Sequence, residues 1–139
     1  METGALGAPY APGQIIVQQG APGECMYVIL EGKVEVFIER DGGEVSLKCC
    51  REGDFLGELA LFNREQHAAS ARALEATRVL SIDRKTFLRR IQEDPTLAFG
   101  LVQSLCQQVK ELNNEVALLN TVVRESLHEH LRQRDAPAP

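Results

Sequence analysis

The sequence contains no apolar run that approaches the ~20 residues needed to cross a membrane as a helix. Residues 1–12 are rich in glycine, alanine and proline and have neither the basic nor the apolar segment of a signal peptide. These absences predict a cytoplasmic protein that has no membrane partner, with a flexible N-terminal segment over residues 1–12.

An excess of basic residues is also missing. Fifteen lysines and arginines stand against 20 aspartates and glutamates, which gives a formal net charge of −5. A nucleic-acid-binding surface normally needs a basic face, so we expect no nucleic-acid partner. Because only seven residues follow Arg132, we also expect no helix-turn-helix.

Motifs for metal binding and catalysis are absent as well. The sequence has no C-x-x-C spacing, no G-x-S-x-G, no H-E-x-x-H and no P-loop. His128 and His130 lie about 200° apart around a helix, which is unfavourable for a shared metal. We therefore expect no metal site and no enzymatic activity, and we expect reduced thiols at Cys25, Cys49, Cys50 and Cys106.

The first two thirds of the chain show the pattern of an all-β domain. Short apolar runs are separated by glycine, aspartate and asparagine, and residues 34–38 alternate between apolar and polar positions apart from Phe37. Asp41, Gly42 and Gly43 form a strong hairpin signal. These features predict an antiparallel, jelly-roll-like β-barrel over residues 13–94, so that the protein is mainly β with a C-terminal α segment.

The pattern becomes helical after residue 84. Phe87 and Ile91 are spaced as in a short amphipathic helix, and Asp94-Pro95 predicts a stop followed by a new helix start. From residue 95 to 132 we expect either one long helix or two helices joined near Gly100. Residues 133–139 are expected to form a disordered tail.

The long helix carries an apolar heptad. Valine at a and leucine at d favour a parallel two-stranded pairing, which predicts a homodimer. The alternative is a helix packed on its own barrel, since that also needs an apolar stripe. The heptad positions are Leu105, Val109, Leu112, Val116, Leu119 and Val123.

Residues 53–73 contain the most specific motif. Gly57-Glu58-Leu59-Ala60-Leu61 is followed by a short loop and then by Gln66-His67-Ala68-Ala69. This stretch resembles the phosphate-binding cassette of the cyclic-nucleotide-binding family, found in bacterial catabolite-activator-type regulators, kinase regulatory subunits and gated channels. Residues 13–20 and 26–34 resemble the first strand and the glycine-bounded hairpin of that family, and the resemblance covers about residues 13–115.

The resemblance implies a cyclic nucleotide site for cAMP or cGMP. It assigns the ribose hydroxyl to Glu58 and close backbone approach to Gly57. It also places Asn113 or Asn114 of the long helix over the purine, where an amide can donate and accept. The explanation that we favour for these asparagines is a place on the exposed face of a coiled coil. The candidate ligand-binding residues are Gly57, Glu58, Leu59, Ala60, His67, Ala68 and Asn113.

One position departs from the family pattern. His67 stands where the family has its phosphate-clamping arginine, and histidine is shorter, has fewer donors and titrates near neutral pH. Three explanations remain open: His67 contacts the anion as an imidazolium, Arg64 substitutes for the arginine, or the pocket no longer binds a cyclic mononucleotide. Arg72 is expected on the opposite strand face in a structural role.

Two functions follow. The first is a stand-alone sensor module that acts as a homodimer, binds a cyclic nucleotide and signals to a partner protein. The second is a ligand-free oligomerisation and docking scaffold that kept the fold.

Overall fold

The computed structural model describes residues 7–134, which divide into two compact units between Phe99 and Gly100. The first unit contains the strands and the two shorter helices. The second unit is most of the long C-terminal helix. No helix of the described residues is long and apolar enough to span a bilayer.

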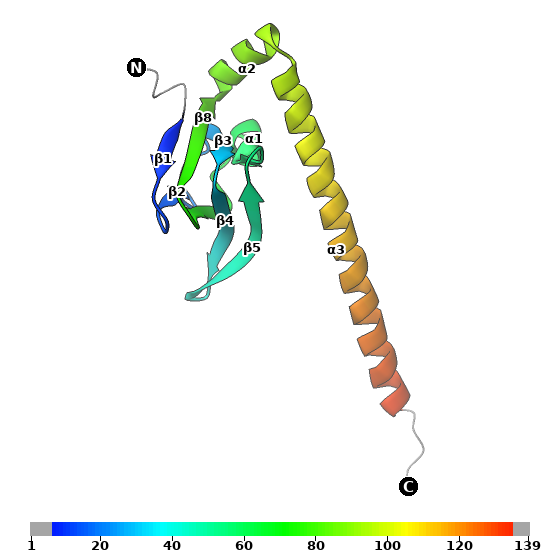
Figure 1. Cartoon of the computed structure of the whole chain (residues 1–139). Helices are drawn as coiled ribbons and strands as arrows, with labels where there is room; N and C mark the ends of the chain where they lie inside the picture. The colour runs from blue at the N-terminus through cyan, green and yellow to red at the C-terminus, as the bar shows by residue number, and fades with distance from the viewer. Residues whose placement is uncertain (1–6, 135–139) are drawn as a thin grey trace. The chain divides into compact units, whose positions relative to one another are not determined.

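The first unit consists of two four-stranded antiparallel sheets (Figure 1). They form the jelly-roll-like arrangement that the sequence predicts, as two separate sheets that do not close into one barrel. One sheet has the order β1 (Ala8–Tyr10), β8 (Thr77–Asp83), β3 (Cys25–Glu31) and β6 (Phe55–Leu56). The other has the order β2 (Ile15–Val17), β7 (Ser70–Ala73), β4 (Lys33–Arg40) and β5 (Gly43–Arg51).

The core lies between the two sheets and is built from aliphatic residues of both. Ile29 and Val79 come from one sheet, and Val34 and Ala73 come from the other; all four are almost fully buried. Apolar area removed from water is the main driving force for this packing. The core therefore fixes the strands that frame the candidate cassette.

The hairpin of β4 and β5 confirms the period of two and adds an irregularity. Val34 and Val36 are buried, as their alternation predicts, but the register shifts between Val36 and Phe37, so that Phe37 is buried as well. On β5 the apolar side chains of Val45 and Leu47 are exposed. A bulge shifts side chains to the other face, which a strictly alternating pattern does not predict.

Part of the N-terminal segment forms a strand, although its composition suggests a loop. Residues 8–10 lie within the segment expected to be flexible, yet they form β1, which pairs with β8 through Ala8 and Val79. The ladder satisfies backbone groups at that edge of β8. Residues 1–6 and 135–139 lie outside the described residues.

The two C-terminal helices have clear starts. In α2 (Arg84–Glu93) the Asp83 carboxylate accepts a hydrogen bond from the Thr86 N–H at 2.7 Å, and Phe87 is buried. In α3 (Thr96–Arg134) the Thr96 N–H donates to Asp94 Oδ1 at 3.0 Å. Figure 1 shows α3 as one uninterrupted helix, so the chain does not break at Gly100.

Candidate functional site

The cassette begins with a tight turn between β6 and a short helix. Gly57 has φ +76°, in the left-handed region that suits glycine, and it directs the chain from β6 into α1 (Glu58–Asn63). Arg64 ends the helix in a second left-handed conformation, with its N–H bonded to the Ala60 carbonyl oxygen. The left-handed conformations of Gly57 and Arg64 thus mark the two ends of α1.

The structure brings part of the predicted site together. Glu58 and Ala60 are buried on the inner side of α1, directly after Gly57. Leu59 is 62% exposed and Ala68 is exposed too, so neither side chain is enclosed with them. Asn113 lies on an exposed turn of α3 in the second unit.

A cysteine that the sequence did not link to the cassette lies near Glu58. Burial raises the pKa of the Cys50 thiol to about 11, and the Glu58 carboxylate adds a smaller contribution in the same direction. Cys50 of β5 belongs to the same core cluster as Leu56, which directly precedes Gly57. The protonated thiol behaves as a small apolar side chain there.

Backbone hydrogen bonds hold the loop after α1 in place. The Gly20 N–H donates to the His67 carbonyl oxygen at 2.8 Å, and the His67 N–H donates to the Ala21 carbonyl oxygen at 2.9 Å. A third bond joins the Gly23 N–H to the Glu65 carbonyl oxygen at 3.1 Å. His67 is thus anchored on both sides to the loop that precedes β3.

The imidazole of His67 packs against Gly57. Only 7% of His67 is exposed, and a Cβ atom on Gly57 would lie 2.9 Å from Cε1 of the ring. The ring of Tyr27 on β3 lies nearby, with 6.4 Å between ring centroids. Tyr27 was not predicted, because its place depends on the pairing of β3 with β6, in which it is opposite Leu56.

Burial lowers the pKa of His67 below its ordinary value of about 6.5. The ring is therefore neutral at neutral pH and gains its proton only under more acidic conditions. A neutral imidazole is both a donor and an acceptor, whereas the imidazolium is a donor at both nitrogens. The charge of the cassette next to Gly57 consequently depends on pH.

This shift predicts an effect on stability. Because the pKa is lower in the folded chain than in the unfolded chain, the contribution of His67 is fully present above the unfolded pKa and is lost as pH falls towards the folded pKa. We expect His67→Gln to show a smaller loss of thermal stability between about pH 7.5 and pH 5.5 than the unaltered protein. Circular dichroism melting curves measure this, and equal losses would contradict the neutral, buried state of His67.

The two arginines considered from the sequence have other surroundings. Arg72 forms ion pairs with Glu35 at 2.8 Å and Glu44 at 2.9 Å, and its guanidinium lies 4.2 Å from the ring centroid of Phe37. The hydrogen bonds to Glu44 and Glu35 raise its pKa. Arg72 thus crosslinks three strands, in the structural role expected for it. Arg64 is exposed in the loop.

Helix α1 also contacts α2. The guanidinium of Arg84 donates a hydrogen bond to the Leu61 carbonyl oxygen and lies 5.7 Å from the centroid of the Phe62 ring. Phe62 in turn meets Phe87 edge to face, with ring centroids 5.2 Å apart. This contact physically joins the cassette to the helix that precedes α3, and no local sequence pattern indicated it.

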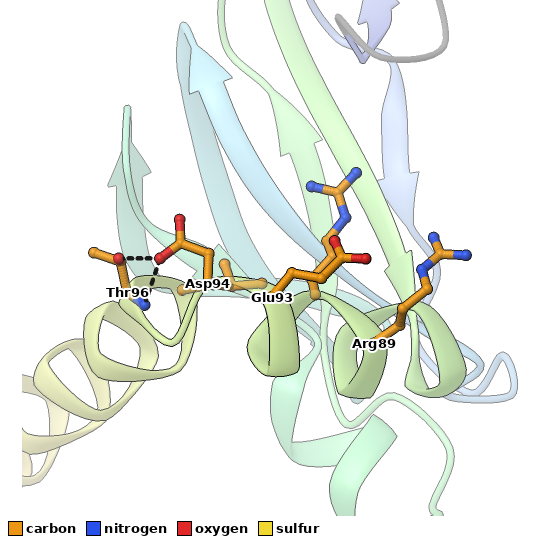
Figure 2. A pocket seen from close by; sticks show the side chains of 6 residues that line it. Arg89, Glu93, Asp94 and Thr96 are labelled. Carbon is orange, nitrogen blue, oxygen red and sulfur yellow. Dashed lines mark hydrogen bonds between the residues drawn. The ribbon is translucent and has the colours of Figure 1, made fainter.

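An open pocket of about 750 Å³ lies where α2 turns into α3, away from the cassette residues (Figure 2). Figure 2 shows Asp94 bonded to Thr96 at this turn, with the side chains of Arg89 and Glu93 on the neighbouring turns of α2. The lining mixes both signs of charge, which suits a solvated junction more than an apolar ligand. The lining residues are Arg89, Arg90, Glu93, Asp94, Thr96 and Leu97.

Similar proteins include regulators that are named for cyclic AMP. The cyclic AMP receptor protein of Thermus thermophilus is 33% identical over 112 residues, which cover 80% of this chain and 52% of that protein. The cAMP-activated global transcriptional regulator of Salmonella typhimurium is 31% identical over 79% of this chain and 53% of its own length. The chain thus spans about half the length of these relatives.

Solved structures of similar proteins show the same fold. The catabolite activator protein of Thermus thermophilus superposes with a TM-score of 0.70 at 32% identity, over 81% of this chain and 54% of that one. The cAMP-bound form of an EAL enzyme gives 0.57 at 27% identity, over 84% of this chain and 32% of the enzyme chain. Residues 8–94 match the model of the cyclic nucleotide-binding domain, and the chain belongs to that family.

Proposed function

We propose that this chain is a cyclic-nucleotide-sensing regulatory module that has no enzymatic activity of its own. The observation that carries the proposal is the cassette itself: a left-handed Gly57, a buried Glu58 beside it, and a basic side chain, His67, facing Gly57. The ligand is cAMP or cGMP, with its phosphate beside Gly57 and His67 and its ribose hydroxyl on Glu58. Relatives named for cAMP support this choice.

The module signals as a homodimer through α3. This helix carries exposed apolar side chains along most of its length, including Val109, Leu112, Val116, Leu119 and Val123. Monomeric soluble proteins rarely expose such an apolar stripe to solvent. Pairing of two α3 helices in a parallel coiled coil would bury these side chains. The four free thiols agree with a reducing compartment, and we place the protein in the cytoplasm, where a second protein receives the signal.

The contact between α1 and α2 provides a route for the signal. A ligand that prefers one position of α1 also biases the hydrogen bond from Arg84 to Leu61 and the packing of Phe62 on Phe87. A ligand shifts such an equilibrium only by its difference in affinity for the two states. Hydrogen exchange at residues 94–100 should therefore change when ligand binds.

The test is a calorimetric titration with cAMP and with cGMP at about pH 6, run beside the variant His67→Arg. We expect the unaltered protein to bind one of them and His67→Arg to bind it roughly tenfold to a thousandfold more tightly, because arginine adds one or two charged hydrogen bonds. Binding by neither protein would overturn the proposal.

A ligand-free scaffold is the second candidate, and one observation favours it. His67 is buried and its pKa is lowered, so at neutral pH the cassette presents a neutral ring where an anion would need a charge. In that case only His67→Arg would bind a cyclic nucleotide. The unaltered chain would then keep its partner protein after Glu58→Ala, with only a modest change in stability.

A further inference from the structure

His67 is the basic side chain that faces Gly57 in the described cassette. Three arginines on the cassette loop, on β7 and at the start of α2 have other surroundings: Arg64 is exposed, and Arg72 is held by Glu35 and Glu44. The third, Arg84, is bonded to the Leu61 carbonyl oxygen. A ligand phosphate that approached Gly57 would therefore meet an imidazole first.

The position of this imidazole is fixed by its backbone. The hydrogen bonds to Gly20 and Ala21 hold His67 on both sides, at 2.8 and 2.9 Å. The ring can move only by rotation of its own side chain, and it now lies against Gly57 with Tyr27 on another side. A phosphate in this place must either displace the ring or accept a hydrogen bond from it.

The two protonation states of the ring act differently on a phosphate. A neutral imidazole has one N–H donor and one nitrogen lone pair, and the lone pair repels a phosphate oxygen. An imidazolium has two donors and a positive charge, and charged hydrogen bonds are about twice as strong as neutral ones. The protonated ring therefore binds an anion at this position much more strongly than the neutral ring does.

We propose that His67 binds the phosphate of a cyclic nucleotide as imidazolium, so that the nucleotide and about one proton bind together. This rests on the function proposed above and concerns its regulation, because a fall in pH increases the affinity of the site for the nucleotide. The ligand phosphodiester stays singly charged over the neutral and mildly acidic range, so the titrating partner is the protein.

The direction of the pH dependence follows from burial of His67 and from the charge of the bound phosphate. Cys25 and Tyr27 on β3, Glu58 on α1 and Glu65 in the preceding loop belong to the elements packed around His67. Burial lowers the pKa of His67 in the empty site, and a bound phosphate anion raises it. Affinity therefore rises as pH falls through the range between these two values, and it levels off below them.

The experiment is calorimetric titration of the full chain with cAMP and cGMP at about pH 5.5, 6.5, 7.5 and 8.5, each in two buffers of different ionisation enthalpy. The buffer pair yields the number of protons taken up with the ligand. We expect affinity to increase at least tenfold from the highest to the lowest pH, with uptake approaching one proton in the middle of the range. His67→Arg should bind with the same affinity throughout, and His67→Gln should bind weakly throughout.

His128→Gln is the matched control, because it removes another histidine from an exposed turn of α3. It should keep the full pH dependence. If the unaltered protein binds equally well at every pH without proton uptake, the inference is wrong and the sensor function stands. If no variant binds at any pH, the proposed function fails and the inference fails with it.

Discussion

Leu112→Asp is expected to abolish the proposed α3 dimer and to leave a monomer at micromolar concentration. Leu112 occupies a d position at the centre of the α3 stripe and is 58% exposed in the single chain. In a parallel pair the same position of the second copy lies opposite, so the substitution places two carboxylates in an apolar seam. We expect the dissociation constant to rise by roughly a hundredfold or more, measured by sedimentation equilibrium.

Leu118→Asp provides the matched control. Leu118 is 64% exposed on the same helix, but it lies about 160° around the helix from Val116 and so outside the stripe. The same charge at that position should leave the dimer intact. If both substitutions produced monomers, or if the unaltered chain were already monomeric, dimerisation through the heptad would be excluded.

Gly32→Ala should cause a large loss of stability, because it combines an unfavourable backbone conformation with a steric overlap. Gly32 joins β3 to β4 with φ +107°, and an added Cβ would lie 2.7 Å from Thr77 Cα and 2.8 Å from the Ala76 carbonyl oxygen. Both neighbours are backbone atoms and cannot rotate away. The left-handed conformation and the overlap together should cost about 2–5 kcal/mol in the free energy of unfolding.

Gly42→Ala separates these two causes. Gly42 lies in the β4–β5 hairpin with φ +80°, and an added Cβ would meet no atom within 4 Å. Only the conformational cost remains, about 1–2 kcal/mol. Urea denaturation compares the two variants, and equal losses would show that the contact with Thr77 and Ala76 is relieved by a small backbone shift.

The sequence predicted the strands and helices well where a local pattern encodes them. The alternation of residues 34–38 and the hairpin at Gly42 appear in the structure as β4 and its turn to β5. The strand β1 was not predicted, because its composition resembles a loop and only the free edge of β8 gives it a partner. The sequence did not decide between one helix and two helices joined near Gly100, because a single glycine costs only about 1 kcal/mol within a helix.

The candidate site was predictable in part. Motif resemblance identified Gly57, Glu58 and His67, which the fold places around one turn. Tyr27 and Cys50 were missed because their closeness to these residues depends on strand pairing across long stretches of sequence. The protonation of His67 also needed the structure, since the lowering of its pKa follows from burial, which the sequence alone does not give.

The open edge of β5 has a consequence for the behaviour of the protein in concentrated solution. β5 pairs with β4 on one side only, and it presents Val45 and Leu47 to solvent. Such an edge is a template for strand addition and aggregation between molecules. The register shift beside Phe37 is a bulge, which increases the local twist of a strand, and Lys48 places a charge on β5. These features protect the edge, so removing the charge of Lys48 would promote self-association through β-sheet extension, independently of α3.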